Sequence, residues 1–172
     1  MNNTIKEGYN MEIKFRKLRE TDFDLLFIWC LDKEVYEWFE QKPLSPKEIT
    51  NKYKKKLEEK KQELLIISID DIDIGFTQIY KYEQEKNIYE FDILIGNKEY
   101  RNKGYGLLII NEINNYIHKK YKAKAIVLRP FKRNTRAIKC YKKCGYKLVK
   151  EYDDKNTIGE DEIVCLLMHE FD

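Results

Sequence analysis

The residues that point most directly to chemistry are two glycines in the stretch "RNKGYG" (residues 101–106). An apolar, strand-like run precedes this stretch and an apolar, helix-like run follows it. The N-terminus of a helix carries unpaired backbone N–H groups and roughly half a positive charge, so it favours an anion. Gly104 and Gly106 would let the backbone come close to such an anion, and Arg101 and Lys103 would add side-chain charge. We therefore expect an anion site at this corner.

Two familiar nucleotide-binding patterns do not fit the corner. The dinucleotide fingerprint G-x-G-x-x-G lacks its third glycine, because position 109 is Ile109. The triphosphate loop G-x-x-x-x-G-K-[ST] is also absent from the sequence. The glycine corner alone therefore does not identify the anion, which must be inferred from motifs elsewhere in the sequence.

A second stretch, "NTRAIKCYKKCGY" (residues 134–146), combines a helix-capping Asn with a Tyr. Asn134 is expected to cap a helix of about ten residues that ends at Gly145. The phenol of Tyr141 can supply a proton to a departing group. Its spacing from Ala137 and Ile138 also allows the alternative that Tyr141 is a core aromatic.

A carboxylate interrupts the apolar strand that precedes the glycine corner. Asp92 stands in "EFDILIG", where it is able to accept a proton from a reacting group. The alternative is an outward-facing strand residue, with Glu90 on the same face because side chains alternate along a strand.

Composition narrows the class of protein. The 172 residues suffice for one domain, and 33 Lys and Arg against 30 Asp and Glu leave a net charge of +3. This balance argues against a dedicated nucleic-acid binder. The densest basic run, "NKYKKKLEEKKQ", is best explained as the solvated face of a helix.

Cysteine usage and hydropathy indicate an intracellular, reduced and soluble protein, so we expect a cytoplasmic location. The four cysteines form no C-x-x-C pair, and with two histidines in the chain we expect no metal site. No apolar stretch approaches the ~20 residues that span a membrane, and the polar start is not a signal peptide.

The elements are expected in the order β-α-α-β-β-β-α-β-α-β-β, as a single domain over residues 1–172 with residues 1–10 flexible. The first helix is expected to follow an N-cap at Thr21 and to run to Phe39, and the second to begin at a capping box of Ser45 and Glu48. Strands are expected at residues 12–18, 63–69, 74–82, 87–95, 123–128, 146–152 and 162–171, and the later helices at 104–120 and 134–145.

The glycine-corner motif (residues 101–106) and the Asn–Tyr motif (residues 134–146) together resemble motifs of the GCN5-related N-acetyltransferases (GNAT). The shared patterns are R-x-x-G-x-G after a strand and N-x-x-A-x-x-x-Y-x-K-x-G-[FY] further on. The resemblance covers nearly the whole chain. It implies an α/β fold with a central mixed, mostly antiparallel, twisted sheet flanked by helices, and acetyl-coenzyme A as co-substrate without a metal.

The resemblance also implies roles for individual residues. Tyr141 would face the thioester sulfur, and Asn134 would contact the cofactor. Leu94 and Ile95 would pair through their backbone with the pantetheine arm. The pyrophosphate would be held by Arg101, Asn102, Lys103, Gly104, Tyr105, Gly106 and Leu107.

Within this family, the chain most resembles the aminoglycoside 6′-N-acetyltransferases. The segments that carry this similarity are "FRKLRETDFDLLFIWCLDKEVYEWF", "IGFTQIYKY" and "DILIG". The similarity implies that Asp92 acts as base or positions the substrate amine. It places the walls of the acceptor cleft at Trp38, Phe39, Gln78 and Tyr80. Glu34, Glu37 and Glu40 lie near that wall, where they would either attract a polycation or form a solvated acidic helix end.

One departure concerns the substrate. Those enzymes often carry Asp-Pro where this chain has Arg129-Pro130. Arg129, together with Lys132 and Arg133, would repel a cationic drug unless these side chains point at coenzyme A phosphates.

The expected function is direct transfer of an acetyl group to a primary amine, most specifically the 6′-amine of an aminoglycoside antibiotic, as a resistance enzyme. No cysteine falls in the cleft motifs, so no acetyl-cysteine intermediate is expected. The alternatives are another amine (a protein N-terminus, a polyamine or a siderophore precursor) or a non-catalytic acyl-coenzyme A-binding module. Neither nucleic acid nor membrane is expected as a partner, and the chain would be a monomer or homodimer.

Overall fold

The strands of the protein form one continuous sheet in the order β1-β2-β3-β4-β5-β7-β6. The computed structural model describes residues 11–171, so the expectation for residues 1–10 lies outside the described part. Every pair of neighbouring strands is antiparallel except β4 and β5, which are parallel. The strands are β1 (Ile13–Lys17), β2 (Gln62–Ile69), β3 (Ile72–Glu83), β4 (Ile88–Ile95), β5 (Ala125–Leu128), β6 (Lys147–Lys155) and β7 (Asp161–Glu170).

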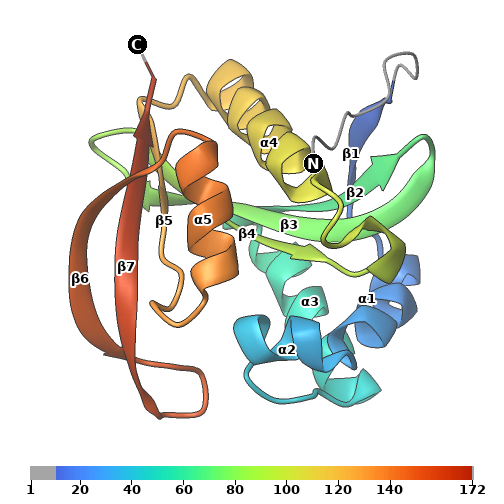
Figure 1. Ribbon diagram of the computed structural model, residues 1–172. Coiled ribbons are helices and arrows are strands. Elements are labelled where there is room, and N and C mark those ends of the chain that lie inside the picture. The colour runs from blue at the N-terminus through green and yellow to red at the C-terminus, as the bar shows by residue number, and fades with distance from the viewer. Residues whose placement is uncertain (1–10, 172) are drawn as a thin grey trace.

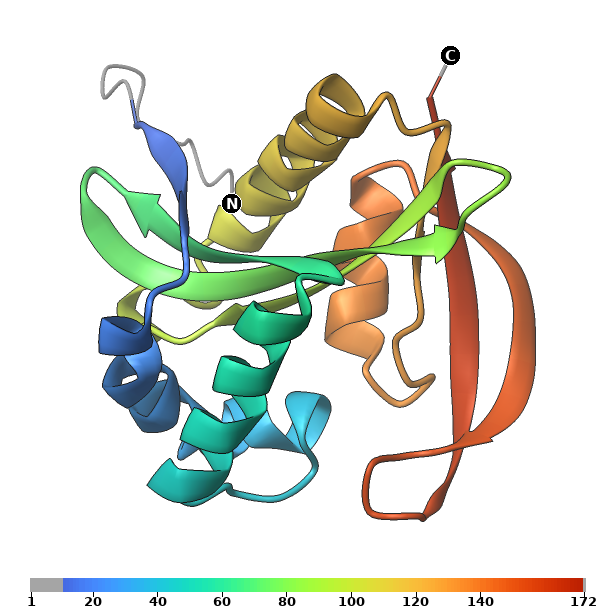
Figure 2. The same ribbon diagram turned by 180° about the vertical axis from the view of Figure 1, so that it is seen from behind.

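Helices cover both faces of this sheet (Figures 1 and 2). On one face lie α1 (Phe23–Cys30), α2 (Lys33–Phe39) and α3 (Pro46–Glu59); on the other lie α4 (Tyr105–Tyr121) and α5 (Thr135–Lys143). The mixed, mostly antiparallel sheet and its flanking helices confirm the expected fold class.

The expected element order holds with one correction, because the first helix is divided. Asp32 has an extended backbone (φ −75°, ψ 126°), and its side chain accepts a hydrogen bond from the Glu34 N–H at 3.2 Å. Asp32 therefore caps α2 and separates it from α1. Thr21 is not the N-cap either, because it lies inside a 3₁₀ turn (Glu20–Asp22) that leads into α1.

The capping signals of α3 are confirmed. The Ser45 Oγ accepts from the Glu48 N–H at 3.3 Å, and the Glu48 carboxylate accepts from the Ser45 N–H at 2.8 Å. Pro46 occupies the first helical position, where its missing N–H costs nothing. Lys60 ends the helix in the left-handed conformation.

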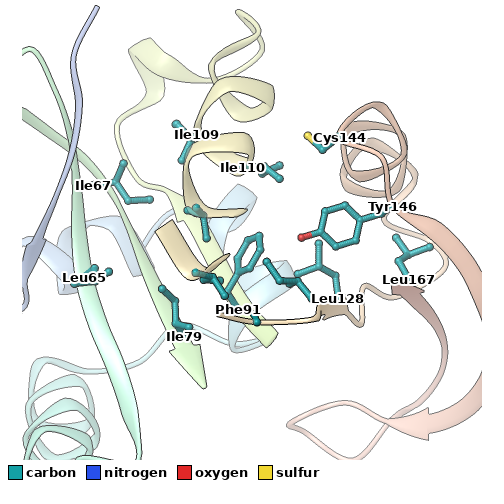
Figure 3. Packing of buried hydrophobic residues seen from close by; sticks show 14 of the residues in the cluster. Leu65, Ile67, Ile79, Phe91, Ile109, Ile110, Leu128, Cys144, Tyr146 and Leu167 are labelled. Carbon is teal, nitrogen blue, oxygen red and sulfur yellow. The ribbon is translucent and has the colours of Figure 1, made fainter. Parts of the chain in front are cut away.

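The main core lies between the sheet and α4 (Figure 3). Ile109 and Ile110 of α4 lie in one cluster with Phe91 of β4 and Leu128 of β5, and all four side chains are buried. Burial of an aliphatic side chain of this size stabilises the fold by roughly 1.5–3 kcal/mol. This packing fixes α4, and with it the glycine corner that precedes it.

The two parallel strands separate after a short paired stretch. Their pairing covers Ile88 to Glu90 on β4 and Ala125 to Val127 on β5, and β4 continues to Ile95 without β5 beside it. Gly96 follows β4 directly, and a Cβ at this position would come within 2.0 Å of the Trp29 ring. Trp29 of α1 therefore packs closely against the residue that follows β4.

Candidate active site

A cavity of about 760 Å³ opens where β4 and β5 separate. Its size lies within the roughly 300–1,000 Å³ of typical small-molecule sites. The walls come from α2, the second half of β4, the loop before α4, α5, and the hairpin between β6 and β7. The expected site residues that line it are Trp38, Phe39, Tyr80, Asp92, Leu94, Ile95, Arg101, Asn102, Gly104, Gly106, Leu107, Asn134 and Tyr141.

The glycine corner forms one end of the cavity. Gly104 caps α4 with φ +88°, a backbone conformation that side chains other than glycine rarely adopt. No heavy atom lies within 4 Å of the position that a Cβ would take there, so the backbone is open to a ligand. The Leu107 N–H donates to the Gly104 carbonyl at 3.2 Å, so this amide is engaged within the turn that begins α4.

Arg101 does not direct its charge into the corner. Its guanidinium donates to the Ile95 and Gly96 carbonyls, both at 2.7 Å, and to the Asp32 carboxylate at 2.6 Å. Its side chain is only 7% exposed. The expectation that Arg101 supplies charge to a bound anion is therefore wrong; the residue ties the end of β4 to the N-terminus of α2.

Three cations on α5 line the cavity instead, and the sequence reasoning missed them. They are Arg136, Lys139 and Lys143, which recur at helical spacing on one side of α5. The Arg136 guanidinium also donates to the Asn102 side chain at 3.1 Å, which links α5 to the glycine corner. The i, i+3, i+7 recurrence of positive charge after Asn134 is the signal that would have found them.

Asn134 and Tyr141 lie on the same helix and line the same cavity. The Asn134 Oδ1 accepts from the Ala137 N–H at 3.2 Å, so the residue caps α5 as expected and its NH₂ group remains for other contacts. Tyr141 is half-buried, and its hydroxyl makes no hydrogen bond within residues 11–171. Burial, and then the charge of Asp92, raises the pKa of the Tyr141 phenol.

Asp92 lies in the cavity wall and is held by two side chains of the neighbouring strand. Gln78 is its partner across the β3–β4 ladder, and the Gln78 Nε2 donates to the Asp92 Oδ2. The Tyr80 hydroxyl lies 3.4 Å from the same oxygen. Burial, followed by the charge of Asp92, raises the pKa of Tyr80, so this phenol keeps its proton.

Glu90 lies two residues before Asp92 and is buried, not outward-facing. Its side chain is 3% exposed, and its Oε1 accepts from the Arg129 Nε at 2.8 Å. Burial raises the pKa of Glu90, and the Arg129 guanidinium opposes that rise. Arg129 therefore neutralises Glu90 and does not stand in the cleft as an unpaired cation.

The acidic wall expected near α2 is paired with cations as well. Glu34 contacts Arg101 at 3.3 Å, Glu37 contacts Arg133 at 3.3 Å, and Glu40 contacts Lys52. The Arg133 guanidinium carbon also lies 4.6 Å from the centre of the Trp38 ring. The expectation of a free negative wall is therefore not met.

Four expected site residues do not line the main cavity. Lys103 is exposed, and Tyr105 packs its ring on Tyr100 at 5.0 Å between centroids. Gln78 donates a hydrogen bond to Asp92 but does not itself line the cavity. Glu37 lines a smaller adjoining pocket with Trp38 and Arg133.

One cysteine does reach the cavity, contrary to expectation. Cys140 lines its wall and is half-buried. The neighbouring Cys144 thiol lowers the pKa of Cys140, against the opposing effect of burial.

Two further features bear on the class of protein. In the described part of the chain, no group of three or more His, Cys, Asp or Glu side chains is arranged to hold a metal ion. Among residues 11–171, no helix has the length and apolar character needed to cross a membrane.

Comparison with solved structures shows the same fold elsewhere. An uncharacterized protein from Bacillus halodurans is similar with a TM-score of 0.84 at 22% identity, over 94% of this chain and 85% of that chain. Aminoglycoside acetyltransferase AAC(6')-Ib in complex with coenzyme A and kanamycin is similar with a TM-score of 0.79 at 19% identity, over 92% of this chain and 95% of that chain. Spermidine N-acetyltransferase from Vibrio cholerae in complex with coenzyme A and spermine is similar with a TM-score of 0.80 at 19% identity, over the same shares.

At these low identities the solved structures show a shared fold and no more. A family model shows the family. Residues 19–154, well over half of the chain, match the model of the acetyltransferase (GNAT) domain. Together with the glycine corner and the Asn–Tyr helix around one cavity, this match shows that the chain belongs to the GNAT acetyltransferase family.

Proposed function

We propose that the protein transfers the acetyl group of acetyl-coenzyme A directly to a primary amine of a polycationic small molecule. One observation carries the proposal: Asp92 from β4 and Tyr141 from α5 line the same cavity as the glycine corner. A proton acceptor and a proton donor thus share one site with a backbone suited to bind a pyrophosphate.

The anionic end of acetyl-coenzyme A fits the glycine corner and the adjoining face of α5. Gly104 offers an open backbone, and Arg136, Lys139 and Lys143 supply the positive charge that Arg101 does not. The separated half of β4 at Leu94 and Ile95 would lie along the pantetheine arm. The NH₂ group of Asn134 would donate to that arm from the opposite side.

The two catalytic roles follow from the proton balance. Bound acetyl-coenzyme A supplies an acetyl thioester. A bond forms between the acceptor nitrogen and the acetyl carbon, the carbon–sulfur bond breaks, and the nitrogen loses a proton. Asp92 takes that proton, and Tyr141, kept protonated by its raised pKa, donates a proton to the leaving sulfur.

Direct transfer requires no enzyme-bound acetyl group. The cavity nevertheless holds the Cys140 thiol, whose lowered pKa favours a thiolate. Initial-rate patterns that intersect would support direct transfer. Ping-pong patterns that disappear in Cys140→Ala would instead indicate an acetyl group carried on Cys140.

The acceptor that we favour is the 6′-amine of an aminoglycoside, which would make the protein a resistance enzyme. The N-terminal and β3 segments resemble those of aminoglycoside 6′-N-acetyltransferases, and AAC(6')-Ib with kanamycin shares the fold. The ion pairs of Arg129, Lys132 and Arg133 support this acceptor, because each of these cations, which would otherwise repel a cationic drug, pairs with a glutamate.

A polyamine is the second candidate acceptor, and a specific observation favours it. A spermidine N-acetyltransferase with bound spermine also shares the fold.

A single assay distinguishes these candidates. Thiol release from acetyl-coenzyme A would be followed with a panel of aminoglycosides, polyamines and peptides. Turnover with kanamycin-class compounds supports the favoured acceptor, and turnover with polyamines alone supports the second. Absence of acetyl-coenzyme A binding by calorimetry would refute the enzyme proposal and favour a binding module.

A further inference from the structure

Lys56 of α3 contacts Gln78, the strand neighbour of Asp92, without lining the cavity. Its Nζ donates to the Gln78 Oε1 at 2.6 Å. Gln78 is 7% exposed and lies opposite Asp92 on the neighbouring strand. Lys56 itself is not among the residues that line the cavity, so it reaches the site only through Gln78.

The side-chain amide of Gln78 has an acceptor oxygen and a donor NH₂ group, and both form hydrogen bonds. Its oxygen accepts from Lys56, and its NH₂ group donates to the Asp92 Oδ2. An ammonium group is donor only and an ionised carboxylate is acceptor only, so together they permit one orientation of the amide. A continuous chain of hydrogen bonds therefore runs from Lys56 to Asp92.

The surroundings leave the charge of Lys56 without a direct partner. Its Nζ makes no ion pair within the described residues; it lies 5.5 Å from the centre of the Tyr53 ring. The charged groups that face it are Lys52 and Glu59 of the same helix, Glu40 after α2, and Asp92 of β4; Glu40 is engaged by Lys52. Burial, and then Lys52, lowers the pKa of Lys56 to about 8.

We propose that Lys56 is a positioning residue for acetyl transfer: through the Gln78 amide it orients the Asp92 carboxylate. This inference rests on the proposed function, because it needs Asp92 as the proton acceptor. Without Lys56, the Gln78 amide loses the partner that holds its oxygen away from Asp92. The variant also lacks a positive charge near the carboxylate, and loss of a nearby cation disfavours the ionised form of a carboxylate in general.

The test compares three variants on one helix. Lys56→Met removes the charge and the donor, and Lys56→Arg keeps both. Lys55→Met is the matched control because Lys55 is exposed and its charge contacts Glu59. The pH profile of kcat would be measured with saturating acetyl-coenzyme A and the best amine of the panel. We expect Lys56→Met to move the acid-side midpoint up by about one pH unit, with the KM for acetyl-coenzyme A unchanged. Lys56→Arg should restore the wild-type midpoint, and Lys55→Met should not move it.

A second readout separates this inference from the proposed function. The side-chain NH₂ signals of Gln78, assigned by their loss in Gln78→Glu, should shift in Lys56→Met and stay in place in Lys55→Met. A wild-type protein that acetylates no amine would refute the proposed function, whereas the Gln78 signals would still test the orientation. Unchanged Gln78 signals, or a pH profile of Lys56→Met equal to that of the wild type, would overturn the inference even if the variant were less stable.

Discussion

Arg129 and Glu90 form an ion pair at 2.8 Å between the loop after β5 and the middle of β4. Glu90 is 3% exposed and Arg129 is 37% exposed, so the pair joins a buried anion to a partly solvated cation. The pair spans the point at which β4 and β5 separate. It therefore stabilises the mouth of the cleft and cancels a charge that would otherwise repel a cationic acceptor.

Removal of the cation from this pair should destabilise the fold. Arg129→Met leaves the buried Glu90 carboxylate without its partner, and we expect a loss of roughly 1–3 kcal/mol in the free energy of unfolding. The loss should shrink in the double variant Arg129→Met/Glu90→Gln, because the unpaired charge is then gone. Urea unfolding of the three proteins checks this, and equal losses in the single and double variants would contradict it.

Gly104 provides a test of the cofactor end. Gly104→Ala should weaken acetyl-coenzyme A binding at least tenfold, because a methyl group would enter the open space in front of the α4 N-terminus. Gly159→Ala is a matched control: this glycine has φ +85°, is equally open and lies outside the cavity. Both variants should lose about 1 kcal/mol of stability from backbone strain. Calorimetric titration that showed equal affinity in both variants would argue against a pyrophosphate at Gly104.

Tyr141→Phe tests the proton donor. Loss of general acid catalysis should lower kcat by about 10²-fold, while affinity for acetyl-coenzyme A stays nearly intact because the ring and its packing remain. Tyr36→Phe, on α2 and outside the cavity, should not change kcat. Steady-state kinetics with a saturating amine provides the measurement, and unchanged turnover of Tyr141→Phe would restore the interpretation as a core aromatic.

Asp92→Asn tests the proton acceptor and the contact with the substrate ammonium. Loss of a carboxylate contact to a buried ammonium typically costs about 2–5 kcal/mol, so the variant should be nearly inactive while still binding acetyl-coenzyme A. Asp71→Asn, an exposed residue in the β2–β3 turn, is the control. Substantial activity of Asp92→Asn at neutral pH would exclude Asp92 as the base.

Much of the architecture followed from local pattern alone. The Ser45–Glu48 capping box, the Asn134 cap and the apolar strands were predicted because each depends on residues close together in sequence. The first helix was predicted too long because its apolar spacing continues through Asp32, and the local competition of that side chain for a backbone N–H was overlooked.

The sequence by itself determined the elements and the motifs that gather around one cavity, since caps, glycines and apolar periodicity act over a few residues. The tertiary structure decided how the charges are used. Arg101 pairs with Asp32, Arg129 with Glu90 and Arg133 with Glu37, across 69, 39 and 96 residues of chain. No local pattern specifies such pairings, because they depend on which strands separate and which helices pack. That is why Arg101, expected to bind an anion, is engaged within the protein, and why the contact of Lys56 with Asp92 through Gln78 could be found only in the folded protein.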